Sequence, residues 1–202
     1  MHSMNSLART SCIILSAGFS GRMGQHKALL LYGRGKTTFI EKITKEYSSA
    51  GITEIVVVVS SDLMKEIVVK HLDMPDNVRF VVNLYPEWGR FYSLKTGLQN
   101  TTKGNYVFFQ NIDNPYVDSE LLFAMAAVCA QANVVIPQFS GKTGHPVLLS
   151  PEVFRAILEN MAIDLRIDDF LRSFRTMLIK TENPKVLVNI NSSLDYKKEF
   201  PG

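Results

Sequence analysis

Short apolar runs rich in β-branched residues alternate with longer amphipathic stretches along the chain. The run EIVVVVS at 54–60 is apolar at almost every position, which is typical of a strand buried on both faces of a parallel sheet. Comparable runs predict strands at 12–15, 78–83, 105–111, 133–139, 145–150 and 185–190. The intervening stretches predict helices at 37–51, 61–72, 90–100, 118–131, 151–161 and 168–177.

This alternation predicts a single α/β domain over residues 11–202, with three α/β/α layers, a Rossmann-like architecture and a mostly parallel sheet. The strand at 145–150 is expected to run in reverse and to form an antiparallel edge. Residues 1–10 are expected to be a disordered N-terminal segment or a remnant of cloning. Ligands of such sheets bind beyond the carboxyl ends of the strands, so we expect functional residues in the segments that follow each strand.

Composition narrows the class of partner. The chain has 22 Lys and Arg against 19 Asp and Glu, a net charge of +3, and these cations form no basic tract of the kind that binds nucleic acid. No apolar stretch approaches the ~18 residues that a membrane helix needs, and the first residues do not resemble a signal peptide. Cys12 and Cys129 lie in apolar runs and are interpreted as buried small side chains. We therefore expect a cytoplasmic protein, a monomer or weak homo-oligomer, with no nucleic-acid or membrane partner.

The segment LSAGFSGRMGQHKALL at 15–30 follows the first predicted strand and combines glycines with two cations. Gly18, Gly21 and Gly24 permit a close approach of backbone N–H groups to an anion, and Arg22 and Lys27 would neutralise its charge. The spacing fits neither the Walker A motif nor the dinucleotide motif G-x-G-x-x-G. The composition indicates a phosphate-binding loop; a glycine-rich surface turn with solvated cations is the alternative.

This loop matches L-x-A-G-x-S-x-R-M-G-x-x-K, which resembles the signature of nucleotidyltransferases with a glycosyltransferase-A-like fold. The most similar branch is the MobA-like group, the molybdenum cofactor guanylyl- and cytidylyltransferases, and Ser-Ala-Gly at 16–18 is more similar to the cytidylyltransferase sequence A-A-G. The resemblance implies that Arg22 and Lys27 are catalytic. It implies nucleotide-binding roles for Leu15, Ala17, Gly18, Ser20, Gly21 and Gly24.

Two later segments extend the resemblance. NLYPEWGRFYSLKTGL at 83–98 resembles N-P-x-W-x-x-G-M-x-x-S-L-x-x-G-L, which borders the base and ribose, and it implies nucleotide-binding roles for Asn83 and Ser93. Arg90 stands where Met is usual. The strand end NIDNP at 111–115 resembles G-D-x-P, which makes Asp113 both catalytic and a ligand of Mg²⁺. An ordinary turn residue is the alternative interpretation of Asp113.

The stretch GKTGHPVLL at 141–149 resembles R-G-H-P-V, which lines the acceptor side, and it implies acceptor-binding roles for Gly144 and His145. A purely structural histidine is the alternative. Toward the carboxyl end the resemblance weakens, because Asn189 and Asn191 replace the two early acids of the pattern D-I-D-T-P-E-D. Asn191 is expected to be a second metal ligand of reduced affinity, since an amide brings no negative charge.

The reaction that the resemblance implies is transfer of an NMP group from CTP or GTP to a phosphorylated small-molecule acceptor, with Mg²⁺ as cofactor and pyrophosphate as product. A molybdopterin-type cofactor is the acceptor expected first. The attacking phosphate is already anionic, so catalysis requires positioning and charge neutralisation rather than a strong base. Two alternatives stay open: a nucleotide-binding protein that has lost transfer, and a transferase acting on a sugar-1-phosphate or similar acceptor.

Overall fold

The computed structural model describes residues 7, 9–18, 23–102, 104–163 and 165–201. Ser20, Gly21 and Arg22 therefore lie outside the described residues, as do 1–6 and 8. Within the first ten residues, Leu7 is buried and Thr10 begins the first strand. Among the described helices, none is long and apolar enough to cross a membrane.

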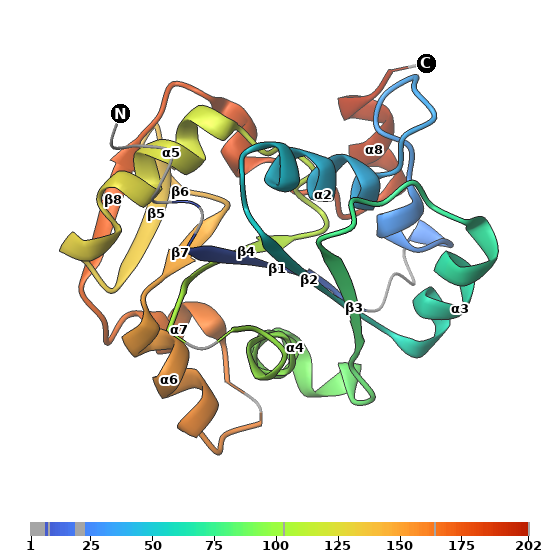
Figure 1. Cartoon of the computed structure of the whole chain (residues 1–202). Helices are drawn as coiled ribbons and strands as arrows, with labels where there is room; N and C mark the ends of the chain where they lie inside the picture. Colours follow the sequence, from blue (N-terminus) through green and yellow to red (C-terminus); the bar gives the residue numbers. More distant parts are fainter. Residues whose placement is uncertain (1–6, 8, 19–22, 103, 164, 202) are drawn as a thin grey trace.

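An eight-stranded sheet lies between two layers of helices (Figure 1). The strands are β1 (Thr10–Ser16), β2 (Glu54–Val59), β3 (Val78–Val82), β4 (Tyr106–Asn111), β5 (Val134–Phe139), β6 (Lys142–Thr143), β7 (Val147–Leu149) and β8 (Thr176–Lys180). The α-helices are α2 (Phe39–Ser49), α3 (Ser61–Lys70), α4 (Gly89–Gln99), α5 (Ser119–Ala127), α6 (Pro151–Glu159), α7 (Ile167–Leu171) and α8 (Ser193–Glu199). Short 3-10 helices are η2 (Lys27–Leu29), η3 (Pro86–Trp88), η4 (Cys129–Gln131) and η5 (Pro184–Leu187).

The strand order is β3-β2-β1-β4-β7-β5-β6, and β8 also pairs with β5. Strands β1 to β4 pair in parallel, and β8 is parallel to β5, whereas β7 is antiparallel to both β4 and β5. The mixed, mostly parallel sheet confirms the predicted fold class. The reversed strand is also present, but it lies inside the sheet rather than at its edge, because β5 and β8 continue the sheet beyond it.

Two predicted elements near the carboxyl end are wrong. The helix expected at 168–177 ends at Leu171, and the chain then forms β8, whose exposure alternates from residue to residue. The strand expected at 185–190 is absent, because Asn183 and Pro184 begin η5 instead, and the Asn183 side chain accepts a hydrogen bond from the backbone of Lys185 (3.0 Å). Helix α8 follows and was not predicted.

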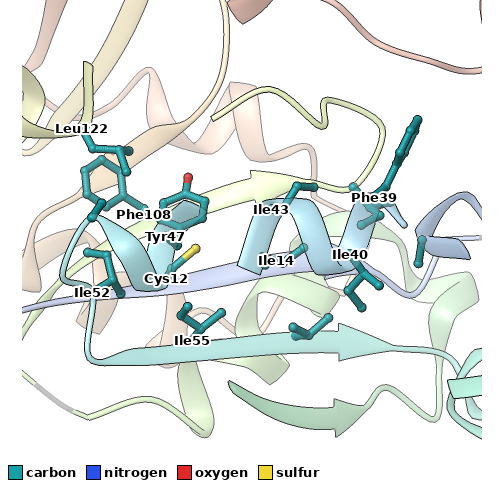
Figure 2. Close-up of a cluster of buried hydrophobic side chains, with 14 of the residues drawn as sticks. Cys12, Ile14, Phe39, Ile40, Ile43, Tyr47, Ile52, Ile55, Phe108 and Leu122 are labelled. Carbon is teal, nitrogen blue, oxygen red and sulfur yellow. The ribbon is translucent and has the colours of Figure 1, made fainter. Parts of the chain in front are cut away.

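The central strands β1, β2 and β4 are buried on both faces, and their side chains alternate between two cores. One core packs α2, α3 and α5 against the sheet; Figure 2 shows part of it, including Cys12, Tyr47 and Phe108. The other core packs α4, α6 and α7 against the opposite face. Cys12 is a free thiol in the first core, as expected, and burial raises the pKa of that thiol.

Helix α4 lies unusually close to the sheet. A Cβ atom added at Gly97 would lie 2.6 Å from the Cγ2 atom of Ile13, a separation that packed atoms do not tolerate. The glycine therefore permits the close approach of α4 to β1. This packing fixes the first turn of α4 near the carboxyl ends of β1 and β4.

Candidate functional site

The segments that follow the parallel strands meet at one edge of the sheet. Leu15 of β1 is paired with Asn111 of β4, and the backbone N–H of Ile112 donates to the carbonyl of Leu15 (3.1 Å). The turn after β1 and the turn that carries Asp113 therefore leave the sheet side by side. This is the edge where ligands of parallel sheets bind, as the sequence pattern predicted.

Lys27, Asp113 and Asn191 converge at this edge from distant parts of the chain. The ammonium of Lys27 donates a hydrogen bond to Oδ1 of Asn191 (2.7 Å) and lies 3.6 Å from Oδ2 of Asp113. The side chains of Lys27 and Asp113 are only 15 % and 22 % exposed, so solvent screens their attraction less than it would at an open surface.

Backbone contacts hold the carboxyl-terminal segment against the turn of Asp113. The N–H of Ile190 donates to the carbonyl of Asp113 (2.8 Å). Immediately afterwards, Oδ2 of Asp195 accepts hydrogen bonds from the hydroxyl of Ser192 (2.8 Å) and from the N–H of Asn191 (3.0 Å). These bonds, that from Ser192 first, lower the pKa of Asp195. The start of α8 thus fixes Asn191 in place beside Lys27.

Asn111 is buried and forms a polar pair with the partly buried His145 behind Asp113. The amide Nδ2 of Asn111 donates to Nε2 of His145 (2.8 Å), so the neutral ring carries its proton on Nδ1. The pKa of His145 is lowered to about 4, mainly by burial; the charges of Asp113 and Asp168 oppose this shift, and the charge of Arg90 adds to it. His145 is therefore a neutral imidazole near neutral pH.

A first cavity of about 160 Å³ opens in front of β1 and β4. It is lined by the turn after β1, by Lys27 and Asp113, and by the first turn of α4. Of the predicted nucleotide-binding residues, the structure brings four to its wall: Leu15, Ala17, Gly18 and Ser93. This cavity is hereafter the donor cavity.

Asn83 does not line the donor cavity. Its side chain is 1 % exposed, donates to the hydroxyl of Ser93 (3.0 Å) and accepts from the N–H of Tyr85 (2.8 Å). Asn83 therefore orients Ser93 from behind. Gly24 lines a neighbouring cavity of about 590 Å³, together with His26 and acidic side chains.

A third cavity, of about 760 Å³, lies on the other side of Asp113 and is hereafter the acceptor cavity. His145, Asn189 and Asn191 contribute to its wall, which also has an apolar part from β5, β7 and β8. Gly144 lines it too, but a Cβ atom there would lie 2.2 Å from the carbonyl oxygen of Val186. Gly144 is therefore required by close backbone packing against η5.

Sequence reasoning missed three charged residues of the acceptor cavity: Arg90, Asp168 and Arg172. Arg90 was visible as a departure from the usual Met. Asp168 and Arg172 lie in a stretch expected to continue as a helix to residue 177, and no pattern placed either side chain near His145. Trp88 stacks on Tyr85 (4.3 Å between ring centroids, 11° between planes) and lines none of the three cavities, which matches an aromatic packed on a loop.

The oxygen atoms at the junction fit a hard divalent cation. Oδ1 of Asp113 is buried and has no hydrogen-bond partner among the described residues, and the amide of Asn191 offers a second, uncharged oxygen. Within the described residues, no group of three or more His, Cys, Asp or Glu side chains could hold a metal by itself. The arrangement is that of a cation held by one or two protein oxygens and completed by substrate phosphates, as is common for Mg²⁺.

Comparisons with known proteins identify a family and a shared fold. The family model described as MobA-like NTP transferase domain matches residues 12–178. Rv0371c of Mycobacterium tuberculosis, in a crystal structure with manganese, is 18 % identical, with a TM-score of 0.75 over 95 % of this chain and 97 % of that one. No curated protein sequence matches the chain.

Two further solved structures share the fold. Molybdopterin-guanine dinucleotide biosynthesis protein A of Archaeoglobus fulgidus is 18 % identical, with a TM-score of 0.66 over 94 % of this chain and 96 % of that one. The 4-diphosphocytidyl-2C-methyl-D-erythritol synthase of Anaerococcus prevotii is 14 % identical, with a TM-score of 0.71 over 96 % of this chain and 97 % of that one. At such identities these likenesses concern the fold alone.

Proposed function

Since the chain belongs to the MobA-like NTP transferase family, we propose that it transfers an NMP group from CTP or GTP to a phosphorylated small acceptor of the molybdopterin type and releases pyrophosphate. One observation carries the proposal. Lys27, Asp113 and Asn191 meet between two cavities, and Asp113 lines both of them. A donor nucleotide and an acceptor would therefore approach the same carboxylate from opposite sides.

The donor cavity is suited to a polyphosphate. Its wall combines the turn of Ala17 and Gly18 with the ammonium of Lys27, which would neutralise negative charge as pyrophosphate leaves. Ser93, held by Asn83, offers a fixed hydroxyl to the sugar or phosphate. Arg22, outside the described residues, is proposed to join Lys27 at the β- and γ-phosphates.

The acceptor cavity is suited to positioning rather than proton removal. A phosphate nucleophile is already ionised, so the reaction needs no general base, and a histidine with a pKa of about 4 is a weak base in any case. The Nδ1–H of a neutral His145 is a donor that has no partner within the part of the chain that the structure describes. We assign His145 to the acceptor side, where it orients the group that attacks the α-phosphate.

A divalent metal is typical of the family, and Mg²⁺ is the proposed cofactor. Asp113 and Asn191 would hold it, and when bound it supplies positive charge that lowers the repulsion between the reacting phosphates. The oxygen of Asn191 accepts a hydrogen bond from Lys27, and a turn of Lys27 toward the nucleotide would leave that oxygen free for the metal.

The replacement of an expected acid by Asn191 favours a second candidate, a protein that binds nucleotide without transferring it. Incubation with CTP or GTP, Mg²⁺ and molybdopterin separates the two. Pyrophosphate release that disappears in Lys27→Ala supports the transferase. Nucleotide binding without release of pyrophosphate supports the binder, and full activity of Lys27→Ala contradicts the proposed role of this cavity. A sugar-1-phosphate in place of molybdopterin tests the remaining acceptor class.

A further inference from the structure

Arg90 occupies the boundary between the donor and acceptor cavities. Among the described residues that line these cavities, Arg90 and Asp113 alone line both. Asp113 is the proposed metal ligand, and Lys27 already balances its charge. The guanidinium of Arg90 is therefore the cation at this boundary that no function assigned above employs.

The present partner of Arg90 is weak. Its Nη2 lies 4.0 Å from Oδ2 of Asp168, and the two side chains are 57 % and 63 % exposed. Ion pairs of that exposure contribute little to stability, because water screens the charges and both side chains lose freedom. Asp168 belongs to α7 and Arg90 to α4, so the pair spans the mouth of the acceptor cavity. Arg90 can leave Asp168 when a more strongly charged oxyanion enters.

The chemistry of the transfer requires positive charge at this boundary. An acceptor phosphate must approach the α-phosphate of a nucleotide, and two anions repel each other at short range. Asn191 contributes no negative charge to retain a metal, so less of the neutralisation can come from a bound cation. A guanidinium is permanently charged, and its planar fork donates two parallel hydrogen bonds to a phosphate, whereas the usual Met donates none.

We propose that Arg90 is a substrate-binding residue that holds the acceptor's phosphate against the α-phosphate of the nucleotide, a role that rests on the proposed function. In the transfer, an acceptor phosphate oxygen forms a bond to the α-phosphorus, and the bond from that phosphorus to the β-bridging oxygen breaks. Pyrophosphate leaves with the bonding electron pair. No proton moves, and Arg90 stays protonated throughout.

The test uses inorganic phosphate as the probe, in calorimetric titrations of the full chain. The protein is first saturated with Mg²⁺ and the α,β-imido analogue of CTP or GTP, whichever binds. The analogue fills the polyphosphate positions. Arg90→Met is expected to weaken phosphate binding about tenfold or more, the size of a lost charge-assisted contact, and to change affinity for the nucleotide analogue by less than about twofold. Arg90→Lys keeps the charge but loses the planar fork, so its affinity for phosphate should lie between those of the wild type and Arg90→Met.

Two further variants sharpen the result. Asp168→Asn removes the carboxylate that competes for Arg90 and is expected to tighten phosphate binding. Arg155→Ala removes an exposed arginine of α6 that lines neither cavity. Its affinities for phosphate and for the nucleotide analogue should equal those of the wild type. Thermal melts check that each variant is folded.

The outcomes separate this inference from the proposed function. A wild-type protein that binds neither CTP nor GTP would overturn both. If nucleotide binds but phosphate does not, or if Arg90→Met binds phosphate as tightly as the wild type, the role of Arg90 is wrong and the nucleotide site stands.

Discussion

Lys27 donates a hydrogen bond of 2.7 Å to the side-chain oxygen of Asn191, 164 residues later in the sequence. This hydrogen bond connects the segment after the glycine-rich loop to the segment before α8. Asp113 lies next to Lys27. In the absence of substrate, the lysine neutralises the carboxylate that a metal would need.

Restoring an acid at position 191 should strengthen metal binding. Asn191→Asp adds a charged oxygen beside Asp113, and we expect the affinity for Mn²⁺, measured by electron paramagnetic resonance with a bound nucleotide analogue, to rise about tenfold. Asn189→Asp is the matched control, because it adds the same charge two residues away without facing Lys27. Equal effects of the two variants would show that net charge, not ligation, is responsible.

Removal of the ammonium should weaken nucleotide binding with little change in the fold. Lys27→Ala is expected to lower the affinity for CTP or GTP about tenfold, because one charge-assisted contact to the phosphates is lost. Isothermal titration calorimetry measures the affinity, and a thermal melt measures the stability. Lys65→Ala, on the exposed side of α3, provides a comparison that should bind as the wild type does. Unaltered affinity in Lys27→Ala would remove this residue from the site.

The buried imidazole makes stability depend on pH. The pKa of His145 is about 4 in the folded protein, below the ordinary value of 6.5, so the unfolded chain binds the proton first as pH falls. Stability is therefore fully present above about pH 6.5 and is lost progressively toward pH 4, by roughly 3 kcal/mol from this residue. Urea titrations across that pH range should show a smaller loss of unfolding free energy in His145→Gln than in the wild type. Parallel curves for the two proteins would contradict the assignment.

Two glycines with predicted site roles should respond differently to a methyl group. Gly144→Ala forces a Cβ atom against the carbonyl of Val186 and should cost about 3 kcal/mol of stability. A Cβ atom at Gly18 would meet no atom of the described residues within 4 Å, so Gly18→Ala should fold normally. Because Gly18 lines the donor cavity, its variant should instead bind nucleotide more weakly. Chemical denaturation and calorimetry together distinguish these outcomes, and a Gly144→Ala protein as stable as the wild type would refute the packing argument.

The amino-terminal half of the fold was predictable because its parallel strands are buried on both faces. The apolar run at 54–60 leaves no helical periodicity, and β2 spans Glu54–Val59. Near the carboxyl end this signal fails. In β8, exposed residues alternate with partly buried ones, and the apolar positions that precede the strand are spaced as in a helix. In η5, an Asn-Pro start outweighs the β-branched residues that follow.

The candidate site was predictable residue by residue but not as an arrangement. Motif positions pointed to Lys27, Asp113 and His145, yet nothing in their spacing indicates that Asn191 would accept a hydrogen bond from Lys27. Asn83 stays a predicted nucleotide-binding residue, and in the structure its buried side chain donates to Ser93, a direction that no motif position indicates. Arg90 is an exposed side chain of α4 whose ion-pair partner, Asp168, belongs to α7. Its position therefore depends on how these two helices pack.

The bond from the N–H of Ile190 to the carbonyl of Asp113 has a consequence for biosynthesis. A ribosome makes the glycine-rich loop and the Asp113 turn long before it reaches residue 190, so a nascent chain exposes both of them without their third neighbour. Full assembly of this edge must therefore wait until residue 190 has left the ribosome.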